Sequence, residues 1–156
     1  MLDIQKVATQ GPALESVKDL FKAYLHELNE DLCFQSFDSE IDNPLYKYSA
    51  PTGALFIATY NATPVGCIAL QPLQDAGTCE MKRLYVDPEY RKFGIGDALV
   101  KALLQEAKTM DYILMKLDTL ERLQAAIKLY QKFGFETVNA YYDNPLPGVV
   151  FMQKEL

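Results

Sequence analysis

The chain has 156 residues, a formal net charge of −6, and 49% hydrophobic against 23% charged residues. These totals favour one globular domain, residues 1–156, and exclude a disordered or low-complexity chain. The excess of acidic residues argues against a nucleic-acid partner, which would need a basic face. Because no apolar run is long enough to span a bilayer and the N-terminus lacks a signal-peptide core, we expect a cytoplasmic protein without a membrane partner.

The cysteines predict neither a disulfide nor a metal site. Cys33, Cys67 and Cys79 are odd in number and scattered, and they form no zinc-binding spacing with His26. Cys67 lies within an apolar stretch, so we expect it to be a small core residue.

The N-terminal part predicts a short strand, a long helix and a loop. Apolar residues between positions 2 and 7 suggest the strand, and a Gly-Pro break starts a helix over 12–29. The apolar stripe of this helix consists of Leu14, Val17, Leu20, Phe21, Tyr24, Leu25 and Leu28. Residues 30–50 are expected to form a loop with one short helix, capped by Ser39 and running toward Pro44.

The central part predicts an antiparallel meander. Two apolar runs, 54–60 and 65–71, indicate a β-hairpin whose turn contains Pro64. A third strand follows over 79–86 and is closed by Asp87-Pro88.

The remaining elements predict a crossover and two final strands. A helix over 94–110 leads to a strand over 113–117, which should therefore run parallel to the third strand of the meander. A helix from Leu123 ends at Gly134 as a C-cap glycine, and strands follow over 135–139 and 149–153. The fold class is α/β (α+β), with a mixed central sheet of about six to seven strands and about four flanking helices.

The turn before the helix at 94–110 carries the main functional signal, Arg91-x-x-Gly94-x-Gly96. A helix N-terminus has unpaired backbone N–H groups and the positive pole of the helix dipole. Glycines let a ligand approach that backbone closely, and Arg91 and Lys92 add positive charge. The pattern therefore predicts an anion site, such as a phosphate site.

This motif resembles the pyrophosphate-binding motif of the GNAT superfamily of N-acetyltransferases. The later stretch Leu129-Tyr130-Gln131-Lys132-Phe133-Gly134-Phe135 is similar to the family's second signature, Leu-Tyr-x-x-x-Gly-Phe. The resemblance covers the chain from Ala54 onward. It implies a GNAT-like fold with a parallel strand pair splayed at the cofactor site, and direct acetyl transfer from acetyl-CoA to an amine without an acyl-enzyme.

The resemblance also implies which residues bind the cofactor. The pantetheine arm would bond to the backbone of the strand end, and the pyrophosphate would bind the glycine turn. These residues are Leu84, Tyr85, Val86, Arg91, Lys92, Phe93, Gly94, Ile95, Gly96 and Tyr130. No metal is implied.

Two residues match catalytic positions of the family. An ammonium acceptor must lose a proton before it can attack, and Glu80 matches the general base, acting directly or through water. It lies four residues before Leu84 and is expected on the same face of the strand. Tyr130 matches the general acid that protonates the leaving thiolate. The structural alternatives are that Glu80 pairs with a neighbouring cation and that Tyr130 is a core aromatic.

Two positions depart from the family pattern. Leu123 stands where many members have an asparagine that contacts the cofactor arm, and Gln124 or Thr119 could replace that contact. Lys92 stands where many members have glycine, which affects the turn more than the chemistry.

The resemblance places the acceptor pocket between residues 24–48 and 141–148. The acceptor is expected to be an amine of a small molecule, amino acid or peptide. A cluster of acidic residues suggests a cationic acceptor, and ordinary solvated loops are the alternative. These acids are Glu27, Glu30, Asp31, Asp38, Glu40 and Asp42. An exposed final strand leaves a homodimer open.

Two other functions are compatible with parts of this sequence. A Rossmann-type site would use Gly94-x-Gly96 with Asp118 as the ribose-binding acid, but Leu99 occupies the third glycine position. A non-catalytic acyl-CoA-binding sensor or interaction module would keep the phosphate turn without needing Glu80 or Tyr130.

Overall fold

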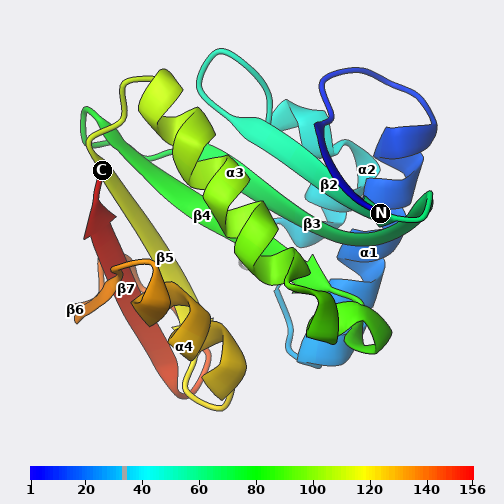
Figure 1. Cartoon of the computed structure of the whole chain (residues 1–156). Helices are drawn as coiled ribbons and strands as arrows, with labels where there is room; N and C mark the ends of the chain where they lie inside the picture. The colour runs from blue at the N-terminus through cyan, green and yellow to red at the C-terminus, as the bar shows by residue number, and fades with distance from the viewer. Residues whose placement is uncertain (33–34) are drawn as a thin grey trace.

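A mixed sheet with the strand order β1-β2-β3-β4-β5-β7-β6 runs through the molecule (Figure 1). The computed structural model describes residues 1–32 and 35–156. The strands are β1 (Leu2–Lys6), β2 (Ala54–Tyr60), β3 (Thr63–Pro72), β4 (Thr78–Val86), β5 (Leu114–Leu120), β6 (Glu136–Val138) and β7 (Val149–Glu155). The α-helices are α1 (Pro12–Leu28), α2 (Phe37–Asp42), α3 (Ile95–Thr109) and α4 (Gln124–Lys132), with 3-10 segments η2 (Pro44–Tyr46) and η3 (Pro88–Phe93).

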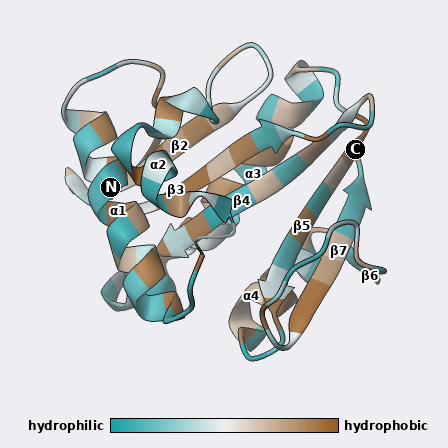
Figure 2. Cartoon of the chain, turned by 180° about the vertical axis from the view of Figure 1, so that it is seen from behind, coloured by the Kyte–Doolittle hydropathy of each residue, from teal (hydrophilic) through white to brown (hydrophobic). Residues whose placement is uncertain are grey.

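Helices cover both faces of this sheet. Helices α3 and α4 pack on one face, and α1 and α2 lie on the other, as the two opposite views in Figures 1 and 2 show. Each face has its own apolar core. The α3 face is built around Leu99 and Leu103, and the α1 face around Phe21 and Leu55. The predicted mixed sheet with flanking helices is confirmed.

Strands β4 and β5 form a short parallel pair. Their register is Thr78↔Leu114, Cys79↔Met115 and Glu80↔Lys116, and the pairing ends there. Beyond this point the two ribbons diverge (Figure 1). The backbone of residues 81–86 therefore has no strand partner on its β5 side, which confirms the expected splay.

A β-bulge in β4 changes which side chains share a face. Cys67 pairs with Tyr85 and Ala69 with Lys82, so the register shifts in between. Arg83 lies in the bulge with φ of 59°. Because a bulge inserts one residue, the alternation inverts after it. Leu84 packs in the α3-side core, and the expectation that Glu80 shares its face is wrong.

Two local predictions are corrected. Pro64 belongs to β3 rather than to the turn; it lies next to a register shift, where proline is tolerated. The tight turn is Asn61-Ala62, with φ of 49° and 68°. Helix α2 begins after Ser36, so Ser39 lies inside it and does not cap it.

The last strand is not an edge of the sheet. Strand β7 pairs with β5 over its whole length and with β6 through residues 151–153. The edges are β1 and β6, so the dimer argument based on an exposed final strand no longer holds.

The remaining sequence predictions have mixed outcomes. Gly134 follows α4 with φ of 94°, as expected of a glycine at a helix C-terminus. Cys67 is fully buried, as expected, and so is Cys79. Cys33 lies outside the described residues. Within residues 1–32 and 35–156, no helix is both long and apolar enough to cross a membrane.

Candidate active site

The N-terminus of α3 leaves its first backbone N–H groups free of helical partners. The predicted basic turn is the 3-10 segment η3, and Gly94 follows it with φ of 71°. The first bond of the helix runs from the Ala98 N–H to the Gly94 carbonyl, and no side chain of the described residues caps the helix. The N–H groups of residues 95–97 are thus available for an anion.

The structure explains why glycine occurs at both positions of the motif. The φ of Gly94 lies in the left-handed region, and a side chain there would meet open space. A Cβ on Gly96 would lie 3.2 Å from Leu129 Cδ2, so this glycine allows α4 to pack against α3. Ile95 between them is fully buried and anchors the helix start in the core.

The two cations of the motif are placed differently. Arg91 Nε donates to the Val86 carbonyl at 2.8 Å, and its Nη2 lies 2.6 Å from a Glu27 carboxylate oxygen. Its charge is therefore compensated locally, whereas Lys92 is exposed. Phe93 is 49% exposed and stacks on Tyr60, with ring centroids 4.8 Å apart.

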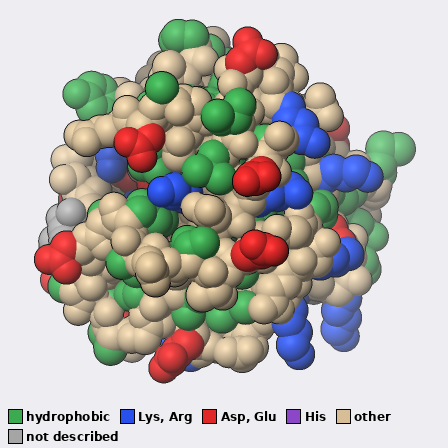
Figure 3. Space-filling view, turned by 90° about the vertical axis from the view of Figure 1, so that its left-hand side faces the viewer, with side chains coloured by type: hydrophobic (Ala, Val, Ile, Leu, Met, Phe, Trp, Pro, Cys, Tyr) green, Lys and Arg blue, Asp and Glu red, His purple; other side chains and the backbone are tan. Residues whose placement is uncertain are grey.

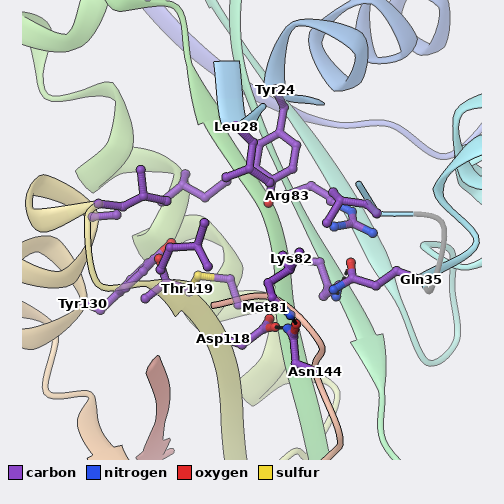
Figure 4. A pocket seen from close by; sticks show the side chains of 16 residues that line it. Tyr24, Leu28, Gln35, Met81, Lys82, Arg83, Asp118, Thr119, Tyr130 and Asn144 are labelled. Carbon is purple, nitrogen blue, oxygen red and sulfur yellow. Dashed lines mark hydrogen bonds between the residues drawn. The ribbon is translucent and has the colours of Figure 1, made fainter. Parts of the chain in front are cut away.

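A small cavity of about 80 Å³ lies where β4 and β5 separate (Figure 4). It collects side chains from α1, β4, β5, α4 and the β6–β7 loop. Its lining includes Tyr24, Leu28, Met81, Lys82, Leu84, Asp118, Thr119, Tyr130 and Asn144. Tyr130 and Leu84, both expected at the cofactor arm, are thus brought into one cavity.

Burial strengthens the hold of Tyr130 on its proton. Desolvation raises the pKa of its phenol well above the ordinary value, and the nearby Tyr24 and Asp118 add to this. The group therefore stays protonated at neutral pH, as a proton donor must.

Glu80 lies in a second, more open cavity of about 520 Å³. Its carboxylate accepts hydrogen bonds from Gln71 Nε2 at 2.7 Å and from the Tyr141 hydroxyl. It is only 3% exposed. The lining consists of Gln35, Lys47, Gln71, Leu73, Gln74, Asp75, Glu80, Lys82, Lys116, Tyr141 and Tyr142.

Lys82 and Gln35 border both cavities. Lys82 Nζ donates to Gln35 Oε1 at 3.2 Å and lies 3.9 Å from Glu80 Oε1. Glu80 and Tyr130 therefore line different cavities with the Lys82 side chain between them. The structure does not bring the two expected catalytic residues into one cavity.

Two adjacent tyrosines hold the β6–β7 loop against the diverging strands. Tyr141 donates to Glu80 on β4, and Tyr142 donates to Asp118 on β5. Desolvation, followed by the nearby carboxylate, raises the pKa of each phenol, so both stay donors. Asn144 Nδ2 adds a bond to Asp118 at 2.9 Å.

Asp118 and Lys82 line the cavities in a way that the sequence pattern did not predict. The sequence offers Asp118 only for a dinucleotide site, although a carboxylate near the end of a parallel strand at a crossover is a usable signal. Lys82 belongs in the sequence to the basic stretch expected to meet a polyphosphate, whereas the bulge places both Lys82 and Arg83 on the α1 face.

One of the two proposed replacements for the missing asparagine reaches the cavity. Thr119 lines it together with Leu123. Gln124 does not, since its amide donates to the Glu121 carbonyl.

The acidic segment does not face the cavities. Glu40 is buried against Arg83, with Arg83 Nε 2.6 Å from its carboxylate. Glu27 pairs with Arg91 and Glu30 with Arg122. None of the acids between positions 27 and 42 lines either cavity, so the charge argument for a cationic acceptor has no support in the geometry.

The antiparallel meander, the splayed parallel pair and the uncapped entrance of α3 together define the architecture of GNAT-like acyltransferases. Residues 14–135 match the model of the acetyltransferase (GNAT) family, and the chain belongs to this family. It is a GNAT-type N-acetyltransferase. This family membership replaces the Rossmann-type alternative.

The chain is similar in sequence to named N-acetyltransferases and in fold to a solved one. An uncharacterized N-acetyltransferase of Schizosaccharomyces pombe is 44% identical over 144 residues, covering 92% of this chain and 88% of that protein. The N-acetylaspartate synthetase of Danio rerio is 36% identical over 103 residues, covering 65% of this chain and 36% of that longer protein. The PaiA N-acetyltransferase of Thermoplasma acidophilum, solved in complex with coenzyme A, has a TM-score of 0.77 at 19% identity, covering 100% of this chain and 99% of that chain.

Proposed function

We propose that the chain transfers an acetyl group from acetyl-CoA directly to the primary amine of a small molecule, amino acid or peptide. One observation carries this proposal: the Tyr130 side chain shares a cavity with the part of β4 that has no strand partner on its β5 side.

The described residues fit the cosubstrate. The free N–H groups at the start of α3 suit its pyrophosphate, and the left-handed Gly94 leaves the approach open. The β5-facing backbone of Leu84, Tyr85 and Val86 suits the pantetheine arm, although Arg91 already uses the Val86 carbonyl. Acetyl-CoA supplies the activated thioester when it is bound.

Tyr130 is proposed as the general acid. Its pKa is raised, so it is a weak acid in the resting site. The same dry surroundings also raise the pKa of a thiol, which keeps proton transfer to a leaving thiolate feasible.

Two carboxylates are candidates for the general base. The sequence pattern favours Glu80, which lies across Lys82 from Tyr130 and is held by Gln71 and Tyr141. The geometry favours Asp118, which lines the same cavity as Tyr130. Replacing each carboxylate with its amide, in Glu80→Gln and Asp118→Asn, separates the two. Loss of the true base should lower kcat/KM strongly at neutral pH and much less at high pH, where the acceptor amine is already deprotonated.

The acceptor is proposed to enter through the open cavity beside Tyr141 and Tyr142. The relatives named N-acetylaspartate synthetase make amino acids the first acceptors to test. The loop between β6 and β7 contributes to both cavities, as an acceptor-binding loop would.

The function is tested by thiol release from acetyl-CoA with a panel of amines, amino acids and peptides. An active acceptor, together with a Tyr130→Phe variant of much lower kcat and near-normal coenzyme A affinity, supports the proposal. Binding of acetyl-CoA without thiol release for any acceptor favours the sensor alternative. Unchanged turnover in Tyr130→Phe removes this residue from the mechanism.

A further inference from the structure

The open cavity is rich in lysine although the chain as a whole is acidic. Lys47, Lys82 and Lys116 line it, against Asp75 and Glu80. Figure 3 shows basic and acidic side chains interspersed on the side of the molecule that lies at the left of Figure 1. We propose that this cavity is a subsite for a carboxylate of the amine acceptor, bound by Lys82 and Lys116; this inference rests on the proposed acetyl transfer to an amine.

Lys82 is a buried cation with unused donors. Its side chain is 7% exposed, and its only hydrogen bond to a described residue goes to the Gln35 amide oxygen at 3.2 Å. The Glu80 oxygen at 3.9 Å is beyond hydrogen-bond distance. An ammonium group has three donors, so Lys82 can still bond to an anion.

The lowered pKa of Lys82 agrees with a buried positive charge that the neighbouring carboxylates compensate only in part. Burial and then the neighbouring Arg83 lower it, and these effects outweigh the nearby carboxylates. An anion at Lys82 would stabilise the charged ammonium and reverse this shift.

Lys116 offers the second cation. It faces Glu80 across the last β4–β5 pair, and its Nζ lies 5.1 Å from the centroid of the Tyr141 ring. Among the described residues it has no carboxylate partner within 4.0 Å. No ion pair with a described carboxylate therefore occupies this ammonium group at the cavity wall.

The other charges around the cavity are largely engaged. Lys47 lies 3.4 Å from Glu40, which is already paired with Arg83. Glu80 receives two neutral hydrogen bonds, and Asp75 is exposed at the β3–β4 turn. Asp118 lines the neighbouring cavity, where Tyr142 and Asn144 bond to it. Lys82 and Lys116 remain as the cations available to a ligand.

The position of Lys82 would place the acceptor amine close to the candidate catalytic residues. It borders both the open cavity and the small cavity with Tyr130. In an amino acid, a single carbon separates the α-amine from the α-carboxylate. A carboxylate held by Lys82 thus leaves its amine at the boundary between the cavities, next to the candidate bases Glu80 and Asp118.

The first test compares acids with their amides as acceptors. The ratio of kcat/KM for glycine over glycinamide, and for alanine over alaninamide, is measured in the wild type and in Lys116→Met. We expect this ratio to fall about tenfold or more, the size of a lost charge-assisted contact. The basicity of each amine cancels because the same acceptors are compared between variants. Lys101→Met, an exposed lysine on α3, is the matched control and should keep the wild-type ratio. An unchanged ratio in Lys116→Met overturns the proposal.

The second test needs no turnover. Succinate, succinamide and inorganic phosphate are titrated into the wild-type chain while the lysine ¹³Cε signals are followed by NMR. Succinate should shift the signals of Lys82 and Lys116, succinamide should not, and both shifts should be lost in Lys82→Met or Lys116→Met. No shift with succinate, or an equal shift with phosphate, overturns the carboxylate subsite. Succinate binding in a chain that acetylates no acceptor would refute the proposed function while leaving the subsite standing.

Discussion

The buried pair of Arg83 and Glu40 gives a stability prediction that can be worked out from the structure. Their side chains are 2% and 0% exposed, and the guanidinium donates to both carboxylate oxygens at 2.6 and 3.0 Å. Arg83 also lies 4.2 Å from the Phe37 ring centroid. The pair therefore ties α2 to the bulge in β4.

Removing one partner should be costly, because the other charge stays buried. Glu40→Leu leaves the Arg83 guanidinium without its carboxylate, which costs about 3–5 kcal/mol of unfolding free energy. For a chain of this size, such a loss lowers Tm by about 10 °C. Urea unfolding followed by circular dichroism, together with a thermal melt, measures both quantities.

A double variant distinguishes an uncompensated charge from lost packing. Adding Arg83→Met to Glu40→Leu removes both charges, so the double variant should be more stable than the single one. Lys47→Met is the control: Lys47 is partly exposed and 3.4 Å from Glu40, so its loss should cost about 1 kcal/mol or less. A cost below about 1 kcal/mol for Glu40→Leu, or a double variant less stable than the single one, would refute the reasoning.

Three further outcomes follow from the site and the core. Gly94→Asp should weaken coenzyme A binding about tenfold or more, as measured by calorimetry. The left-handed φ of this residue disfavours a side chain, and a carboxylate repels phosphate. Unaltered affinity would contradict the anion site. Gly96→Ala should push Leu129 away and loosen the contact between α4 and α3, so the variant should have a lower Tm than the wild type. An equal or higher Tm would contradict this prediction. Cys67 and Cys79 should resist iodoacetamide in the native chain at pH 8 and react after unfolding. The reason is that burial raises the pKa of both thiols, that of Cys79 to about 12. Labelling of either cysteine in the native chain, detected by peptide mass, would be the contrary result.

The position of the bulge matters for these proposals. A regular strand would have turned either Lys82 or Arg83 toward the α3-side core. The inserted residue instead places both on the α1 face, where Arg83 holds Glu40 and Lys82 borders the two cavities. The same shift turns Leu84 to the side opposite Glu80.

The sequence by itself determined the order of elements and the place of the glycine turn before α3. Helix α1 follows from its apolar stripe, the turn before α3 from its two glycines, and the parallel pairing of β4 and β5 from the length of the crossover. These features depend on residue patterns within single stretches of the chain and on the conformations that glycine and proline allow.

Only the tertiary structure decided how the site is divided. The bulge at Arg83, the position of Lys82 between Glu80 and Tyr130, and the bonds from Tyr141 and Tyr142 all depend on contacts between distant segments. A bulge leaves almost no trace in the residue types around it, and a shift of one residue in register reverses every side chain that follows. The acidic segment shows the same limit, because its charge could be counted from the sequence while its partners Arg83, Arg91 and Arg122 could be found only in the folded chain.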